Sequence, residues 1–168
     1  MIFDPEFLEA LERQSARPWV GTVYRHMFAD HDPLAGNIRG ARWNPPDVEA
    51  IYASLNRETA LAEAEYRISV QPLRPRARRT VFTLRVELQN ALEIENFHEL
   101  EKLGVSKRDF EGFDMSACQR IGWAVAWLGH DGLIVPSARA DGQNLVIFPS
   151  GLDSKTTLEV VGEEPVPE

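Results

Sequence analysis

Apolar residues recur along this chain with the periods of both strands and helices. The sharpest alternation runs over residues 79–88, where apolar and polar side chains face opposite sides of a predicted strand. The apolar side of that strand consists of Phe82, Leu84, Val86 and Leu88. Strand character continues over residues 90–96. Shorter runs rich in β-branched residues predict further strands at 19–28, 50–54, 131–137 and 143–149.

Helical spacing predicts four helices, over residues 4–14, 56–70, 98–104 and 116–130. Asp4 and Asn56 suit N-cap positions, and Pro5 suits the first turn of the first helix. Pro72 and Pro75 end the second helix. Because these helices and the strands follow one another in no strict alternation, the pattern predicts a compact α+β fold.

The chain carries no composition change typical of a linker, so residues 1–168 are expected to form a single domain. Its core is expected over about residues 18–150, preceded by the helix at 4–14. The last residues, 162–168, are acidic and contain two prolines, which predicts a frayed tail.

Charge and composition narrow the possible partners. The formal net charge is −8, which argues against binding to nucleic acid or to an anionic membrane surface. No apolar run approaches the roughly 20 residues that a membrane span needs. The arginine-rich segment 74–79 is interpreted as a solvated loop, with an anion-facing patch as the alternative. A single cysteine, Cys118, fits a reducing cytoplasm.

Polar residues at the ends or faces of the apolar elements are the candidates for chemistry. They are Arg25, Arg42, Tyr52, Glu63, Glu65, Ser116, Ser137 and Asn144. Guanidinium groups match phosphate oxygens bidentately, and a carboxylate can hold ribose hydroxyls and stabilise positive charge at an anomeric carbon. Together they suit a substrate that carries phosphate and ribose. Taken alone, each arginine fits an ordinary surface ion pair better.

Periodicity does not decide between the two glutamates of the second helix. Glu63 and Glu65 lie on opposite flanks of the apolar arc formed by Ala60, Ala64 and Ile68. Either carboxylate is therefore expected to be partly buried.

Other familiar signatures are missing or weak. The sequence has no glycine-rich dinucleotide or phosphate-loop motif. His26, His31 and Asp32 lack a second spaced cluster of ligands, so we interpret them as part of a turn and expect no metal. Cys118 lies in an apolar helix and is interpreted as a structural thiol.

An ordered set of short motifs resembles the RES family, the toxin half of bacterial toxin–antitoxin pairs. The set runs from VYR (23–25) through GARWN (40–44), AIYAS (50–54), ALAE (60–63) and MSACQRIGWAVAW (115–127) to DGLIVPSARADGQNLVIFP (131–149). The resemblance implies a fold similar to ADP-ribosyltransferase toxins, with small twisted mixed or antiparallel sheets that frame a nicotinamide dinucleotide cleft.

The family is named for an arginine, a glutamate and a serine. By resemblance, the arginine matches Arg42 or Arg25, the glutamate matches Glu63 and the serine matches Ser137. Some members also use a serine at the position of Ser116. The choice of Glu63 over Glu65 therefore comes from the resemblance.

The resemblance also implies an activity. Family members degrade NAD by hydrolysis or phosphorolysis, or transfer ADP-ribose to a protein target, and their partner is an Xre-type antitoxin that blocks the cleft. We accordingly expect Arg25 and Arg42 on the NAD phosphates, Tyr52 against the nicotinamide ribose and Glu63 at the anomeric carbon. Ser137, Ser116 and Asn144 would orient the sugar or the leaving amide, and NAD is expected as the substrate without a further cofactor or metal.

Two prolines give the arginine loop a physical rationale. Pro45 and Pro46 restrict the preceding residues to extended conformations, so Arg42 is presented from a stiff loop. The competing hypotheses are a protein-modifying ADP-ribosyltransferase with the same site and a non-catalytic nucleotide-binding module.

Overall fold

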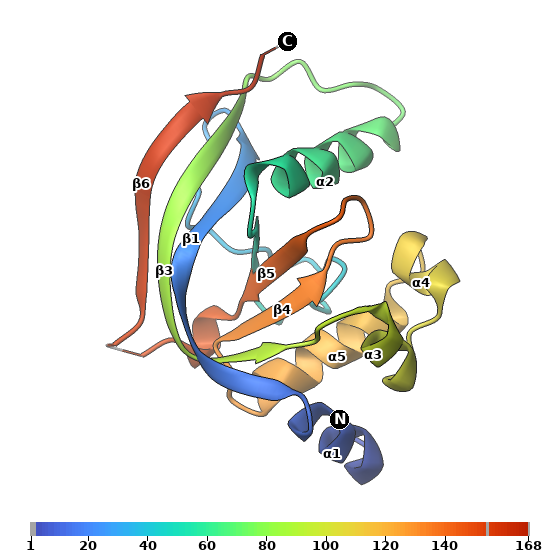
Figure 1. The fold of residues 1–168 in the computed structure, drawn as a ribbon. Helices are drawn as coiled ribbons and strands as arrows, with labels where there is room; N and C mark the ends of the chain where they lie inside the picture. Colours follow the sequence, from blue (N-terminus) through green and yellow to red (C-terminus); the bar gives the residue numbers. More distant parts are fainter. Residues whose placement is uncertain (1–2, 154, 168) are drawn as a thin grey trace.

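The computed structural model of the chain describes residues 3–153 and 155–167 (Figure 1). Positions 1, 2, 154 and 168 of the expected single domain lie outside the described residues, and so does the last residue of the expected tail. In chain order the elements are α1 (Pro5–Glu12), β1 (Ser15–Phe28), β2 (Ile51–Ser54), α2 (Arg57–Ser69), β3 (Arg79–Glu93), α3 (Phe97–Lys102), α4 (Lys107–Glu111), α5 (Ser116–Trp127), β4 (Gly132–Pro136), β5 (Gln143–Ile147), the 3₁₀ turn η1 (Pro149–Gly151) and β6 (Thr157–Pro165).

The strands form one six-stranded mixed sheet in the order β1-β2-β5-β4-β3-β6. β1 also pairs with β3 along almost its whole length, so the sheet closes on itself through five strands and β6 lies outside the ring. β3 and β4 run parallel, whereas the other named pairs are antiparallel. The α+β expectation is confirmed, with a single curved sheet in place of several small ones.

Two apolar cores lie on the two sides of this curved sheet. The inner core packs Val23, Leu84, Val86, Leu145 and Ile147 of the strands against one another. The other core joins the strands to α1, α3, α4 and α5. In Figure 1, α1, α3 and α5 lie at the lower end of the sheet, whereas α2 lies at its upper end. α2 is thus separated from the other helices, and its neighbours are the strands β1, β2 and β5.

The alternation is confirmed over residues 83–88, where Leu84, Val86 and Leu88 are buried, but it is wrong at Val81, which was placed on the polar side and is fully buried. The expected frayed tail is wrong over residues 162–165, which belong to β6 and pair with β3. Most side chains of β6 are at least partly exposed, so backbone pairing rather than burial holds this strand, and the apolar pattern gives no sign of it.

Candidate active site

A cavity of about 260 Å³ opens between β1, β2, α2, the β4–β5 hairpin and the loop that contains residues 37–43. Five of the residues expected from the sequence line it, namely Arg25, Arg42, Tyr52, Glu63 and Asn144. Ser137 joins the group because it contacts Glu63 directly. Ser116 lies elsewhere: its hydroxyl donates to Asp114 at 2.6 Å, and the exposed side chain does not line the cavity.

α2 positions the glutamate. The Asn56 side chain caps the helix by accepting a hydrogen bond from the Thr59 N–H at 2.8 Å. Ala60, Ala64 and Ile68 form the buried stripe of the helix. Glu63 consequently faces the cavity on the flank of that buried stripe.

Two neutral donors hold one oxygen of Glu63. Its Oε2 accepts a hydrogen bond from the Ser137 hydroxyl at 2.8 Å and from the Asn144 amide Nδ2 at 2.6 Å. The Ser54 hydroxyl donates to Asn144 Oδ1 at 2.7 Å, which fixes the orientation of that amide. Among the described residues Oε1 has no hydrogen-bond partner, so this oxygen is available to a ligand.

The β4–β5 hairpin supplies both donors from its two sides. At the start of the turn the Ser137 hydroxyl also accepts the backbone N–H of Arg139 at 3.0 Å and of Ala140 at 3.3 Å. Gly142 approaches the start of α2 so closely that a Cβ there would collide with the Thr59 hydroxyl. The hairpin is therefore seated directly on α2.

Tyr52 organises the loop that carries Arg42. Its hydroxyl accepts the Trp43 N–H at 2.9 Å and donates to the Asn44 Oδ1. The Asn44 amide in turn donates to the Val48 carbonyl at 2.7 Å. Burial raises the pKa of Tyr52 above its ordinary value, so the phenol stays protonated and keeps its donor.

Arg42 has a structural role as well as a place in the cavity wall. Its Nη1 donates to the Asp109 carbonyl at 2.8 Å and its Nη2 to the Gly112 carbonyl at 2.6 Å. These bonds tie the arginine loop to α4 and to the segment after it. From the other side Gly122 of α5 abuts the Trp43 carbonyl, where no side chain has room.

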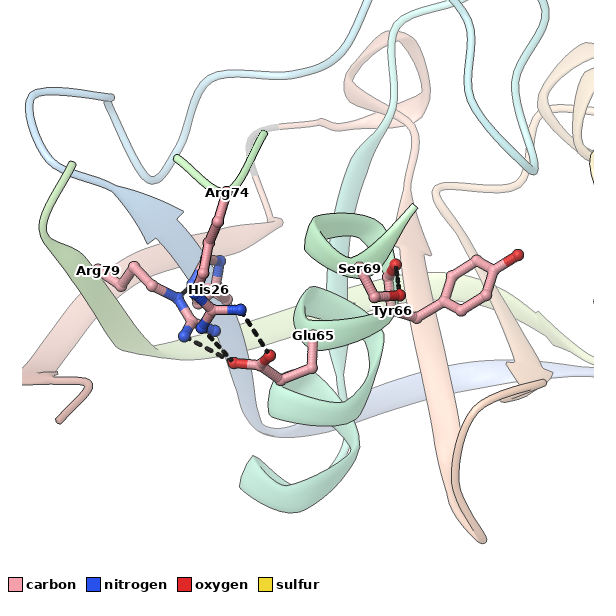
Figure 2. A network of polar contacts seen from close by, with 6 residues as sticks. All are labelled: His26, Glu65, Tyr66, Ser69, Arg74 and Arg79. Atoms are coloured by element: carbon pink, nitrogen blue, oxygen red, sulfur yellow. Dashed lines mark hydrogen bonds and ion pairs between the residues drawn. The ribbon is translucent and has the colours of Figure 1, made fainter. Parts of the chain in front are cut away.

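Figure 2 shows why the second glutamate differs from the first. Glu65 points away from Tyr66 and accepts Arg79 Nη1 at 2.7 Å, with Arg74 at 3.5 Å. Arg79 Nε donates to Nε2 of the buried His26 at 2.8 Å. Glu65 is therefore engaged in an ion-pair network on the outer side of α2 and does not line the cavity.

The pKa values of two arginines that line the cavity, Arg25 and Arg67, are lowered by their surroundings. Burial, followed by the nearby charge of Arg67, lowers the pKa of Arg25 to about 10, while Asp32 opposes the shift. Burial also lowers the pKa of Arg67, and the charge of Glu63 opposes that change. A guanidinium group stays charged in proteins at neutral pH, so the cavity contains the positive charges of both Arg25 and Arg67.

Comparison with known proteins identifies the family of the chain. The family model of the RES domain matches residues 19–166. The chain belongs to the RES domain family. Curated relatives are the NAD(+) phosphorylase MbcT proteins of Mycobacterium bovis and Mycobacterium tuberculosis, each 27% identical over 143 residues that cover 80% of this chain and 77% of the relative.

A solved structure shows the same fold. The crystal structure of the M. tuberculosis MbcT–MbcA toxin–antitoxin complex matches with a TM-score of 0.83 and 24% sequence identity. The match covers 97% of this chain and 93% of the other. The RES fold expected from the sequence is thus confirmed.

The structure adds residues to this RES cavity that the sequence did not single out. Arg67 and Ser54 line it, and the Arg139 guanidinium lies 3.3 Å from the centre of the Tyr66 ring. Arg67 follows Glu63 by four positions, so helical spacing alone was enough to place both on one face. Ser54 carried no signal, because its role depends on pairing between β2 and β5.

Two further candidates raised by the sequence are the thiol of Cys118 and a metal site. Cys118 is buried, and burial raises the pKa of its thiol to about 11, as expected for an inert thiol. Within residues 3–153 and 155–167 no group of three or more histidine, cysteine, aspartate or glutamate side chains could hold a metal ion. In that same part of the RES chain no helix is long and apolar enough to cross a membrane.

Proposed function

We propose that this protein cleaves NAD at the bond between nicotinamide and ribose and thereby acts as the toxin of a bacterial toxin–antitoxin pair. The observation that carries the proposal is the state of Glu63: one oxygen is held by Ser137 and Asn144, the other has no hydrogen-bond partner among the described residues, and the side chain lines the same cavity as Arg25 and Arg42. Membership in the RES family and the names of its mycobacterial relatives support the same activity.

The proposed reaction uses each side chain according to its position. Arg25 and Arg42 bind the phosphates of NAD, and the Tyr52 ring packs against the nicotinamide ribose. As the glycosidic bond breaks, positive charge grows on the ribose and nicotinamide leaves as a neutral molecule. The Glu63 carboxylate holds a ribose hydroxyl and stabilises that charge.

Ser137 and Asn144 serve this step indirectly. Their hydrogen bonds fix the Glu63 carboxylate before NAD arrives, so little rearrangement is needed as charge develops. The resemblance also implied a role for Ser116, but its hydroxyl donates to Asp114 at 2.6 Å outside the cavity wall, so we expect it to contribute little.

We further propose that the partner is an Xre-type antitoxin that covers the cavity. The M. tuberculosis structure contains MbcT together with the antitoxin MbcA, which supports a partner of this kind. Because NAD is a cytoplasmic metabolite, the proposed activity places the protein in the cytoplasm.

The test is a measurement of nicotinamide release from NAD by the purified protein, with and without inorganic phosphate. We expect release, with ADP-ribose 1″-phosphate as the product when phosphate is present. Label that moves from NAD onto protein in a lysate would instead identify a protein-modifying ADP-ribosyltransferase. Tight NAD binding without nicotinamide release would contradict the proposal and identify a binding module.

A further inference from the structure

The tip of the β4–β5 hairpin makes a contact that the proposed reaction does not use. The Arg139 guanidinium lies 3.3 Å from the centre of the Tyr66 ring, and both residues line the cavity. Both are half-buried. A guanidinium stacked on an aromatic face contributes more when it is shielded from water, so the partial burial strengthens this contact.

The residues of α2 that face the hairpin share one stripe of the helix. Thr59, Glu63 and Tyr66 follow one another at the helical spacing i, i+4 and i+7. At the end of the hairpin turn, Gly142 lies so close to the Thr59 hydroxyl that a Cβ would collide with it. Arg139 lies over Tyr66, farther along the helix. The hairpin is therefore anchored to α2 on both sides of Glu63.

The backbone of the turn links the stacked arginine to the carboxylate of Glu63. The Ser137 hydroxyl accepts the Arg139 N–H at 3.0 Å and the Ala140 N–H at 3.3 Å. The same hydroxyl donates its single proton to Glu63 Oε2 at 2.8 Å. Because the two N–H groups occupy the lone pairs of this oxygen, the conformation of the turn decides where its proton points. A turn that moved away from α2 would also release the hydroxyl from Glu63.

Little else can hold the tip of the turn on α2. The backbone hydrogen bonds between Ser137 and Gly142, at 2.9 Å, and between Gly142 and Ala140, at 3.0 Å, lie within the hairpin itself. Asp141 is exposed. Arg139 is therefore the long side chain of the turn that contacts α2.

We propose that Arg139 is a positioning residue, which holds the hairpin turn on Tyr66 and so keeps the Ser137 hydroxyl on Glu63. This inference rests on the proposed function and extends it beyond the residues that contact Glu63. A carboxylate that is already aligned needs less rearrangement as positive charge grows on the ribose. Loss of the stack should therefore lower kcat, whereas the binding of NAD depends on other side chains of the cavity.

The experiment compares the parent protein with Arg139→Gln and Tyr66→Leu. Arg120→Gln is the matched control, because Arg120 stacks on the Phe7 ring at 3.8 Å and does not line the cavity. Nicotinamide release is measured with NAD varied at a fixed concentration of inorganic phosphate. We expect Arg139→Gln and Tyr66→Leu to lower kcat about 3- to 10-fold, the size of one stacked cation, with the KM for NAD within about twofold of the parent. Arg120→Gln should match the parent.

Conservative variants show whether the stack itself matters. Tyr66→Phe keeps the ring and should retain more activity than Tyr66→Leu. Arg139→Lys should lie between the parent and Arg139→Gln, because it keeps the charge and loses the planar group. A rise in the KM for NAD with kcat unchanged would overturn the proposal and make Arg139 a group that binds NAD.

The connection through Ser137 has a test of its own. If Arg139 acts through Ser137, adding Arg139→Gln to Ser137→Ala should cause no further loss of kcat. Losses of kcat that multiply in the double variant would show that Arg139 acts independently of Ser137 and would contradict the positioning role.

A further measurement separates this inference from the proposed function. Hydrogen exchange of the Arg139 and Ala140 amides is followed by NMR without NAD. Both N–H groups bond to the Ser137 hydroxyl, so Tyr66→Leu should make them exchange about 3- to 10-fold faster, whereas Arg120→Gln should not. If the parent releases no nicotinamide, the proposed function has failed, and this measurement still decides whether the stack holds the turn. Equal exchange in the parent and in Tyr66→Leu would refute the inference.

Discussion

Glu63 and Glu65 are two residues apart in the same helix, yet they have opposite surroundings. Glu63 is held by a hydroxyl and an amide and keeps Oε1 open to the cavity. Glu65 is paired with Arg74 and Arg79 on the outer side of the helix. Neutral hydrogen-bond donors orient a carboxylate and leave its negative charge in place, whereas paired arginines neutralise that charge. The comparison indicates which of the two carboxylates remains available for electrostatic catalysis.

The largest expected effect comes from removing the Glu63 charge. Glu63→Gln should lower kcat for nicotinamide release about 100- to 1,000-fold, because the amide keeps the shape of the side chain and loses its charge. Glu65→Gln is the matched control and should stay within about threefold of the parent. Nicotinamide release by both purified variants measures this. Loss of activity in Glu65→Gln alone would reverse our choice of carboxylate.

The network around Glu65 should affect the pH dependence of stability through His26 of β1, which is buried, is bonded to Arg79 and also lines the cavity. Burial, then the charges of Arg79 and Arg67, lower the pKa of His26 to about 4. Between about pH 6.5 and pH 4 the unfolded chain therefore binds a proton that the folded chain does not, and stability falls as the pH falls. His26→Gln removes this proton uptake.

Across that pH window the parent should lose about 2 kcal/mol more of its unfolding free energy than His26→Gln does. Urea unfolding of both proteins at several pH values measures the difference. Parallel pH curves for the two proteins would show that His26 is not held neutral by its surroundings.

A smaller effect is expected from one of the donors that hold Glu63. Asn144→Ala removes the 2.6 Å hydrogen bond to Oε2 and should lower kcat about 10-fold, with little change in the KM for NAD. Gln143→Ala is the control, because successive side chains of β5 face opposite sides. A rise in KM without a fall in kcat would instead make Asn144 a binding group.

The smallest effect should come from Ser116. Its exposed hydroxyl is bonded to Asp114 at the start of α5, outside the cavity wall. Ser116→Ala should leave nicotinamide release within about twofold of the parent, since surface changes of this kind are usually small. A loss as large as that expected for Asn144→Ala would restore the contribution expected from the resemblance.

Local signals in the sequence predicted most of the elements correctly. The alternation over β3 and the Asn56 cap of α2 depend on neighbouring residues, and both appear in the structure. β6 escaped notice because it is held by pairing with the distant strand β3. α4 was missed although its sequence carries a local signal, since the Ser106 hydroxyl caps it by accepting the Asp109 N–H at 3.1 Å.

The site shows the same limit of local signals. Helical spacing left both glutamates possible, and family resemblance was needed to choose between them. What separates them physically is contact with residues far along the chain, since Ser137 is 74 positions from Glu63 and Arg79 is 14 from Glu65. Arg67 was within reach of sequence reasoning because it follows Glu63 at helical spacing, but only the structure shows that this face of the helix lines the cavity.

The separation between Glu63 and Asn144 has a consequence during protein synthesis. The two residues are 81 positions apart, so a ribosome that adds about 5–20 residues per second makes the second roughly 4–16 s after the first. Throughout that interval the nascent chain has its glutamate but lacks the hairpin that fixes it. Each newly made copy therefore passes through a period in which its catalytic apparatus is incomplete.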